Sequence, residues 1–180
     1  MTSPDKRYFN FNSTRQPAPG SIHYPLLKIN PAVIVPDSVA IIDAHGTETG
    51  TVADMQVEND GNVYSVAEIS HTPGFEFVIK FVSVPFFKFM QVTGAYEGST
   101  AHTPIIQLYD FVNAVYQTKR AMLHFPNYNL AAGENVIDRY ETIIQNSDNY
   151  ISGEEVWLRI IHTQAGNPAH DIHIDYASLF

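Results

Sequence analysis

The chain has 180 residues, of which 44% are hydrophobic, and its 10 basic and 19 acidic side chains give a formal net charge of −9. This length allows one domain with a substantial core. The negative charge and the lack of a basic cluster argue against a nucleic-acid partner, and the absence of cysteine excludes disulfides, thiol catalysis and cysteine-ligated metal centres.

No stretch of the chain resembles a signal peptide or a membrane-spanning helix. Residues 1–20 are polar with scattered aromatic side chains, and no apolar run reaches the roughly 18 residues that a spanning helix requires. We therefore expect a soluble protein without a visible export signal and without a membrane partner.

The first 36 residues differ in composition from the rest and contain six of the eleven prolines. Because proline fixes φ and cannot donate to a strand ladder, residues 1–36 are predicted to form an extended arm before a β-domain at 37–180. The arm either lies on its own domain or binds a neighbouring subunit. The apolar anchors expected to bind a partner are Tyr8, Phe9, Phe11, Tyr24, Leu26 and Leu27.

Alternation of apolar and polar residues with a period of two predicts strands in the first half of the domain. The strongest stripe is formed by every second residue from Phe75 to Phe81, and Asp60-Gly61 marks a turn before it. The predicted strands cover residues 39–43, 63–69, 75–81 and 86–92, and the last of them comes before Gly94–Gly98.

Residues 104–122 fit two kinds of structure. Thr103-Pro104 is a good helix start, and Ile105, Leu108 and Val112 fit one helical face. The stretch is nevertheless rich in β-branched and aromatic residues and has strands as neighbours, which favours strands. The residues alone leave both open. A further strand is expected at residues 140–144.

The C-terminal segment contains two alternating runs, at 156–161 and 172–176, which read as a closing hairpin joined by a turn-rich loop at 166–168. In the second run, Asp171, His173 and Asp175 have one parity and are expected to share a strand face. Such a face can hold a metal ion, but a polar surface strand looks the same. We therefore predict no metal site and no cofactor, with these three residues as the candidates should a metal bind.

A catalytic site is not evident in the chain. There is no Gly-x-Ser-x-Gly motif, and the strand-borne carboxylates Glu68, Glu76 and Glu155 show no spacing that singles out a glycosidase pair. We therefore predict a protein that is not an enzyme.

Aromatic side chains that stack on sugars offer an alternative kind of site, with Tyr96, Tyr109, Tyr116 and Trp157 as the side chains to examine. Aromatic residues also build sandwich cores, so the position of Tyr96 and Trp157 decides between the two roles. The candidate ligand-binding residues are Tyr96, Trp157, Asn167, His170 and Asp171.

Several short motifs occur in an order that resembles the galactose-binding-like jelly-roll β-sandwich of bacteriophage virion proteins. They are Gly46–Asp54, Asp60–Glu68, Thr72–Phe75, Gly94–Gly98, Ile106–Tyr109, Tyr150–Gly153, Leu158–His162 and Gly166–Tyr176. The resemblance spans about Val39 to Leu179. It implies an all-β jelly roll, strands rather than a helix at 105–122, and no catalytic residues.

The resemblance also implies a place on a phage particle. The leading hypothesis is a virion structural protein, a capsid decoration or cement protein on the particle surface, made in the host cytoplasm. Its arm is expected to bind major capsid or tail subunits, in a homo-oligomer for which a trimer at a symmetry axis is one arrangement. The alternative is a tail or adhesion module that binds host carbohydrate, and the third hypothesis is a metal-assisted hydrolase that uses Asp171, His173 and Asp175.

Overall fold

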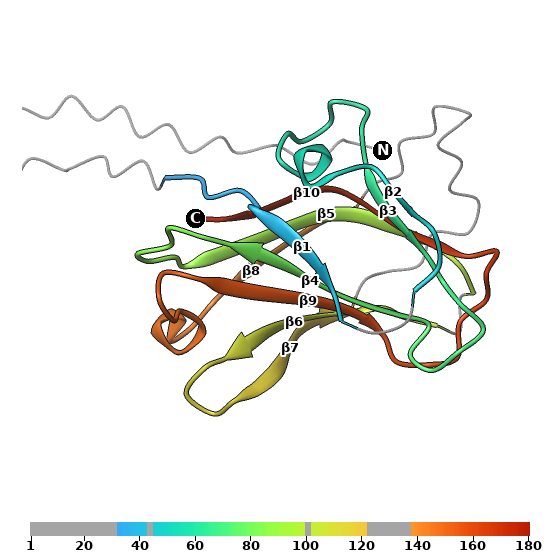
Figure 1. Cartoon of the computed structure of the whole chain (residues 1–180). Coiled ribbons are helices and arrows are strands. Elements are labelled where there is room, and N and C mark those ends of the chain that lie inside the picture. The colour runs from blue at the N-terminus through green and yellow to red at the C-terminus, as the bar shows by residue number, and fades with distance from the viewer. Residues whose placement is uncertain (1–31, 43–44, 100–101, 122–137) are drawn as a thin grey trace, which may run out of the picture. The chain divides into compact units, whose positions relative to one another are not determined.

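A computed structural model describes residues 32–42, 45–99, 102–121 and 138–180, and these residues form a jelly-roll β-sandwich of two five-stranded antiparallel sheets (Figure 1). The strands are β1 (Ser38–Ile41), β2 (Glu48–Thr49), β3 (Tyr64–Ala67), β4 (Phe75–Phe81), β5 (Phe89–Glu97), β6 (Ile105–Asp110), β7 (Val115–Ala121), β8 (Asp138–Ile143), β9 (Val156–His162) and β10 (Asp171–Leu179). Two 3-10 helices accompany them, η1 (Val52–Met55) and η3 (Ser147–Tyr150). The first sheet has the strand order β1-β4-β9-β6-β7, and the second has the order β2-β3-β10-β5-β8.

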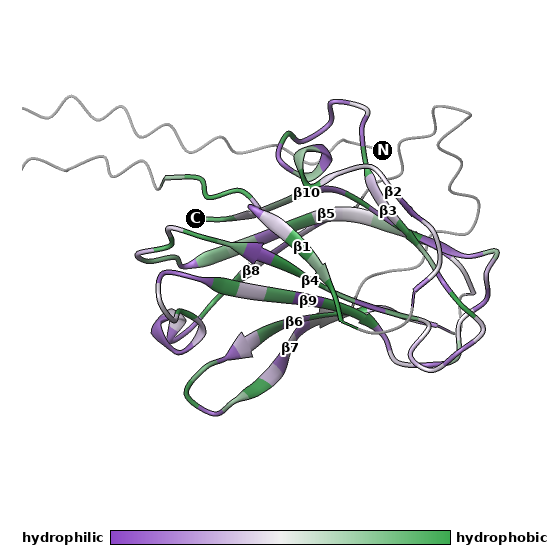
Figure 2. Ribbon diagram, in the orientation of Figure 1, coloured by the Kyte–Doolittle hydropathy of each residue, from purple (hydrophilic) through white to green (hydrophobic). Residues whose placement is uncertain are grey.

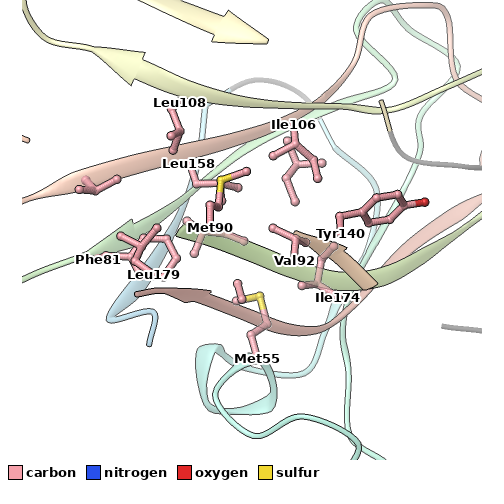
Figure 3. Close-up of a cluster of buried hydrophobic side chains, with 14 of the residues drawn as sticks. Met55, Phe81, Met90, Val92, Ile106, Leu108, Tyr140, Leu158, Ile174 and Leu179 are labelled. Carbon is pink, nitrogen blue, oxygen red and sulfur yellow. The ribbon is translucent and has the colours of Figure 1, made fainter. Parts of the chain in front are cut away.

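The core lies between the two sheets and follows from the period-two pattern of their inner faces. In β4, Phe75, Phe77, Ile79 and Phe81 are all 0% exposed, as the sequence predicts for this stripe. Figure 2 shows hydrophobic and hydrophilic residues alternating along β9, and in Figure 3 Leu158 and Leu108 of the first sheet lie near Met90 and Val92 of the second. Each such large side chain stabilises the fold by roughly 1.5–3 kcal/mol when it is fully buried.

Residues 105–121 form the hairpin β6–β7, which confirms strands in place of a helix. Its turn covers residues 111–114, and Ala114 adopts a positive φ of 52°. The Asp110 carboxylate accepts hydrogen bonds from the backbone N–H groups of Val112 and Asn113, at 3.0 and 2.9 Å. A carboxylate that binds the backbone within three residues favours a turn over a helix, which explains why the helical pattern is overridden here.

Two expectations about strand pairing and extent are wrong. β9 and β10 do not form a hairpin, because β9 pairs with β4 and β6 in the first sheet whereas β10 pairs with β3 and β5 in the second. The loop between them therefore crosses from one sheet to the other. The strand predicted at 86–92 instead runs from Phe89 to Glu97 as β5, where Gly94 allows the backbone of β10 to approach closely.

A β-bulge in β10 changes which side chains share a face. The register of β10 on β5 shifts between Ile174 and Tyr176, so that Ile172 and Ile174 face the core but Tyr176 does not. Asp175 sits at this irregularity, and its carboxylate accepts the backbone N–H of Asn59 at 3.1 Å. The bulge interrupts the alternation of faces along β10, so Asp175 does not share a face with His173 as the sequence predicted.

The first described residues pair with the last strand of the sandwich, β10. Ile34 exchanges two backbone hydrogen bonds of 2.9 Å with Leu179 of β10. By its contacts the chain divides into residues 1–30 and a unit that runs from Pro31 to Phe180. Within the described part of the chain, no helix has the length and apolarity that a membrane span requires.

Candidate functional site

Four partly exposed aromatic side chains meet on the outer face of the first sheet, and we call them the aromatic face. Trp157 is on β9, Tyr109 on β6, Tyr116 on β7, and Phe111 in the turn that joins β6 to β7. The inner faces of β6 and β9 carry Leu108 and Leu158 into the core, so the neighbouring positions point outward because side chains alternate along a strand.

The rings of the aromatic face contact one another. The Tyr109 and Trp157 rings have centroids 5.4 Å apart and are inclined by only 32°, while Tyr116 and Phe111 meet Tyr109 edge to face at 4.9 and 5.0 Å. These separations are those of favourable aromatic pairs. The partly exposed rings of Trp157 and Tyr109 therefore form a closely packed, inclined pair, which we call the platform, and the other two rings contact this pair edge to face.

A polar network centred on Arg159 borders the platform. Arg159 donates to Gln107 and Glu76, each at 2.7 Å, and its guanidinium lies 3.8 Å from the Tyr116 ring centroid. Gln107 in turn donates to Thr118 at 3.1 Å. The network presents amide, hydroxyl, guanidinium and carboxylate groups beside exposed aromatic rings.

Polar groups also engage the edge and one face of the Trp157 ring. Its indole N–H donates to Glu155 at 2.9 Å, and the ammonium of Lys80 lies 5.0 Å from the ring centroid. These contacts hold the indole in one orientation. Burial raises the pKa of Tyr116 above its ordinary value, so its hydroxyl remains neutral and able to donate a hydrogen bond at physiological pH.

Tyr96 does not belong to an exposed platform, which corrects its prediction as a ligand-binding residue. It is 0% exposed, and its hydroxyl donates to Glu68 at 2.7 Å. Burial raises the pKa of Tyr96, as desolvation disfavours the phenolate. Tyr96 is a core residue with a satisfied hydroxyl, and it offers no ring face to a ligand.

Glu68 is the centre of a buried polar cluster at the end of the sandwich. Besides Tyr96, its carboxylate accepts the backbone N–H of Asn167 at 2.7 Å and lies 2.6 Å from Nδ1 of His162 and 3.3 Å from Nδ1 of His170. Burial lowers the pKa of His162. His162 and the loop at 166–170 thus meet through a shared carboxylate, and this cluster ties the crossing loop to the sandwich.

The loop residues predicted to bind a ligand therefore lie far from Trp157. Asn167 and His170 are held at the end of β9 that carries His162, whereas Trp157 is near the beginning of that strand. Five residues of strand separate the two positions by roughly 17 Å. The structure does not bring Trp157 and the loop together into one site.

Asp171 and His173 come together with Glu97 rather than with Asp175. The possible metal-ligating atoms of Glu97, Asp171 and His173 all lie within 4.8 Å of one another. The β-bulge and the contact with Asn59 remove Asp175 from this group. The predicted trio is wrong in its third member, because parity holds only along an uninterrupted strand.

The predicted arm anchors Tyr8, Phe9, Phe11, Tyr24, Leu26 and Leu27 lie outside the described residues, and their role in binding a partner stays a prediction. Sequence reasoning missed Phe111, Gln107 and Arg159 as neighbours of Trp157. Once 105–111 is taken as a strand, the outward parity of Gln107, Tyr109 and Phe111 is a signal for this face. The pairing of β6 with β9, which makes them neighbours, has no local signal.

The chain matches no protein-family model, and no curated protein sequence matches it. Similar solved structures include the family 11 carbohydrate-binding module from Clostridium thermocellum in complex with a β-1,3-1,4-mixed-linked tetrasaccharide, with 8% identity over 79% of this chain and 87% of that chain and a TM-score of 0.49. The CBM36-1 domain of a multidomain xylanase from the hindgut metagenome of Trinervitermes trinervoides has 10% identity over 83% of this chain and 95% of that chain, with a TM-score of 0.43.

The enzymatically active domain of tailspike protein 4 from bacteriophage CBA120 is also similar, with 11% identity over 83% of this chain and 19% of that chain and a TM-score of 0.40. Identities this low and TM-scores below 0.5 say nothing about what this chain binds. The geometry of the aromatic face is therefore the basis for assigning a function.

Proposed function

We propose that the protein is a carbohydrate-binding β-sandwich that binds a glycan on its aromatic face. The observation that carries this proposal is the platform formed by Trp157 and Tyr109, partly exposed on the outside of a rigid sheet and bordered by the Arg159 network. A sugar ring has an apolar face of C–H groups and a rim of hydroxyls. The aromatic rings of the platform can stack on the apolar face, and the polar groups of the Arg159 network can form hydrogen bonds with the hydroxyls.

The strand scaffold prepares this site before a ligand arrives. Trp157 is fixed by Glu155 and by packing on Tyr109 and Phe111, so that little rotamer entropy remains to be lost on binding. Arg159 is likewise held by two acceptors. A preorganised aromatic platform with a few placed polar groups is the arrangement expected of a small-molecule or glycan site.

The arrangement of the strand-borne carboxylates supports binding rather than hydrolysis. Glu76 is engaged by Arg159, Glu155 by the indole N–H of Trp157, and Glu68 is buried in the histidine cluster. A glycosidase requires two carboxyl groups that flank the sugar linkage, one of them able to donate a proton. The three carboxylates that the sequence singled out are instead occupied in separate structural contacts.

Glycan binding by a β-sandwich fits the role of an adhesion module on a phage particle. That the protein belongs to a phage particle stays a prediction. The capsid-decoration hypothesis depended on the arm as the partner-binding element. Its anchors lie outside the described residues, and within residues 32–36 the described pairing with a strand is that of Ile34 with Leu179 of the same chain. Nothing in the described structure favours capsid decoration over glycan binding.

A glycan array followed by affinity measurements with the best ligand tests the proposal. We expect Trp157→Ala and Tyr109→Ala each to weaken binding by about 5- to 150-fold, since the loss of a stacking ring is worth about 1–3 kcal/mol by analogy with base stacking. Phe89→Ala is the matched control, because Phe89 is an aromatic residue of the second sheet and is 45% exposed.

An array without any ligand, or a ligand whose affinity is the same in Trp157→Ala and in the unmodified protein, contradicts the proposal. Equal losses in Trp157→Ala and Phe89→Ala contradict it as well, because they show that the effect does not belong to the aromatic face.

A further inference from the structure

A second group of functional side chains lies on the outer face of the other sheet, remote from the aromatic face. Asp171 of β10 and Glu97 of β5 are directly opposite each other in the antiparallel pair. His173 follows Asp171 by two residues and therefore shares its face, before the bulge changes the parity. The strand pairing thus sets two carboxylates and one imidazole beside one another.

The imidazole of His173 is held in one orientation. His173 is 6% exposed, and its Nδ1 lies 2.7 Å from the hydroxyl oxygen of Ser65, the residue directly opposite on β3. This contact directs Nε2 to the side of Glu97, whose Oε2 is 3.6 Å away. A hydrogen bond at the ring nitrogen that does not bind the metal commonly fixes the orientation of a metal-binding histidine.

The separation of these two atoms is informative. At 3.6 Å, Nε2 of His173 and Oε2 of Glu97 are farther apart than the roughly 2.7–3.2 Å of a good N–H···O hydrogen bond. Two ligands of one tetrahedral ion with bonds of about 2.1 Å are roughly 3.4 Å apart. The observed distance is close to the second value, and all three candidate ligand atoms lie within 4.8 Å of one another.

We propose that Glu97, Asp171 and His173 form a binding site for a zinc-type divalent transition-metal ion, with Nε2 of His173 and one oxygen of each carboxylate as its protein ligands. The two carboxylates balance the charge of the ion. The imidazole selects against Ca²⁺ and Mg²⁺, which prefer all-oxygen coordination. The side chain of Glu97 is 50% exposed, so the remaining coordination positions face solvent.

The contact with Ser65 leaves Nε2 as the ring nitrogen that faces the proposed ion, because it is Nδ1 that lies 2.7 Å from the Ser65 hydroxyl oxygen.

Equilibrium dialysis of the full chain against Zn²⁺, with quantification of bound metal and calorimetric titration, tests this site. We expect one Zn²⁺ per chain, and we expect Glu97→Gln and Asp171→Asn each to weaken its binding at least about tenfold. Glu97 is half exposed, so its substitution leaves the fold intact. An equal concentration of Ca²⁺ is expected not to displace Zn²⁺.

Glu48→Gln is the matched control, because Glu48 pairs with Nε2 of His45 at 2.9 Å but belongs to no group of three metal-ligating residues in the described part of the chain. Its affinity for Zn²⁺ is expected to equal that of the unmodified protein. Absence of stoichiometric Zn²⁺, unchanged affinity in both Glu97→Gln and Asp171→Asn, or displacement by Ca²⁺ overturns the proposal. None of these results bears on the aromatic face, which lies on the other sheet.

Discussion

Replacing Glu68 with glutamine is expected to lower the free energy of unfolding by about 1.5–3 kcal/mol, the range for one hydrogen bond to a charged group. The side chain of Glu68 is 0% exposed, and its two oxygens receive the Tyr96 hydroxyl and the Asn167 N–H, each at 2.7 Å. A glutamine amide keeps one acceptor oxygen and puts an NH₂ donor in place of the other. With the amide oxygen at the Asn167 N–H, the NH₂ group meets the Tyr96 hydroxyl, which must then accept a hydrogen bond instead of donating one.

The magnitude follows from the two hydrogen bonds that the Glu68 carboxylate accepts. Hydrogen bonds to a charged group contribute about 1.5–3 kcal/mol each, and glutamine keeps an acceptor for one of the two, so the expected loss is about 1.5–3 kcal/mol. The Nδ1 atom of His162, 2.6 Å from Glu68, loses its carboxylate neighbour in addition. Against a total stability of about 5–15 kcal/mol, this change is large.

Urea unfolding with linear extrapolation measures the effect. With a slope of roughly 2 kcal/mol/M, the midpoint is expected to fall by about 0.75–1.5 M. Glu141→Gln is the control, because the Glu141 side chain is 58% exposed and such surface changes alter stability by less than about 0.5 kcal/mol. A Glu68→Gln protein within about 1 kcal/mol of the unmodified protein would refute this reasoning, because the buried cluster would then not stabilise the fold.

Two further predictions concern stability. Burial lowers the pKa values of His162 and His173 from 6.5, so the unfolded state binds more protons than the folded state below that pH. The stability present above about pH 6.5 is therefore lost as the pH falls. Urea midpoints between pH 7.5 and 5.5 check this, and a midpoint that is constant or rises in acid contradicts it. Gly94→Ala is expected to destabilise the protein by about 1–3 kcal/mol, because its new Cβ overlaps the carbonyl oxygen of His173 on the paired strand; thermal unfolding measures this, and an unchanged melting temperature would mean that β5 and β10 are not packed as described.

The elements with strong local patterns were predictable from the sequence. The stripe from Phe75 to Phe81 predicts β4 with its observed bounds and its buried face. Residues 105–121 were not decided by pattern alone, because apolar spacing fitted a helix and a strand equally. The resemblance to jelly-roll domains indicated strands, and the turn that Asp110 stabilises gives the physical reason.

Features that depend on distant partners were not predictable. Nothing local in 156–176 indicates that β9 joins β4 and β6 while β10 joins β3 and β5. The buried hydroxyl of Tyr96 donates a hydrogen bond to Glu68, which lies 28 residues earlier in the chain. The bulge at Asp175 likewise depends on the pairing of β10 with β5, and it replaced Asp175 by Glu97 as the neighbour of His173.

The aromatic face likewise combines features that the local sequence indicates with features that depend on distant strand pairing. Trp157 and Tyr109 were candidates from residue type, and alternation along each strand places them on outer faces once the strands are known. Their contact at 5.4 Å depends on β6 lying next to β9, which is a property of the whole sheet. Residue chemistry thus identified members of the site, and the strand order assembled them.

Trp157 is the single tryptophan of the chain, so its fluorescence reports directly on the proposed glycan site. The most direct test is to titrate the best array ligand into the protein and to follow tryptophan emission beside calorimetric binding. We predict a saturable change in emission with the same dissociation constant as the calorimetric isotherm. Calorimetric binding without any change in Trp157 emission would contradict the claim that the aromatic face binds the glycan.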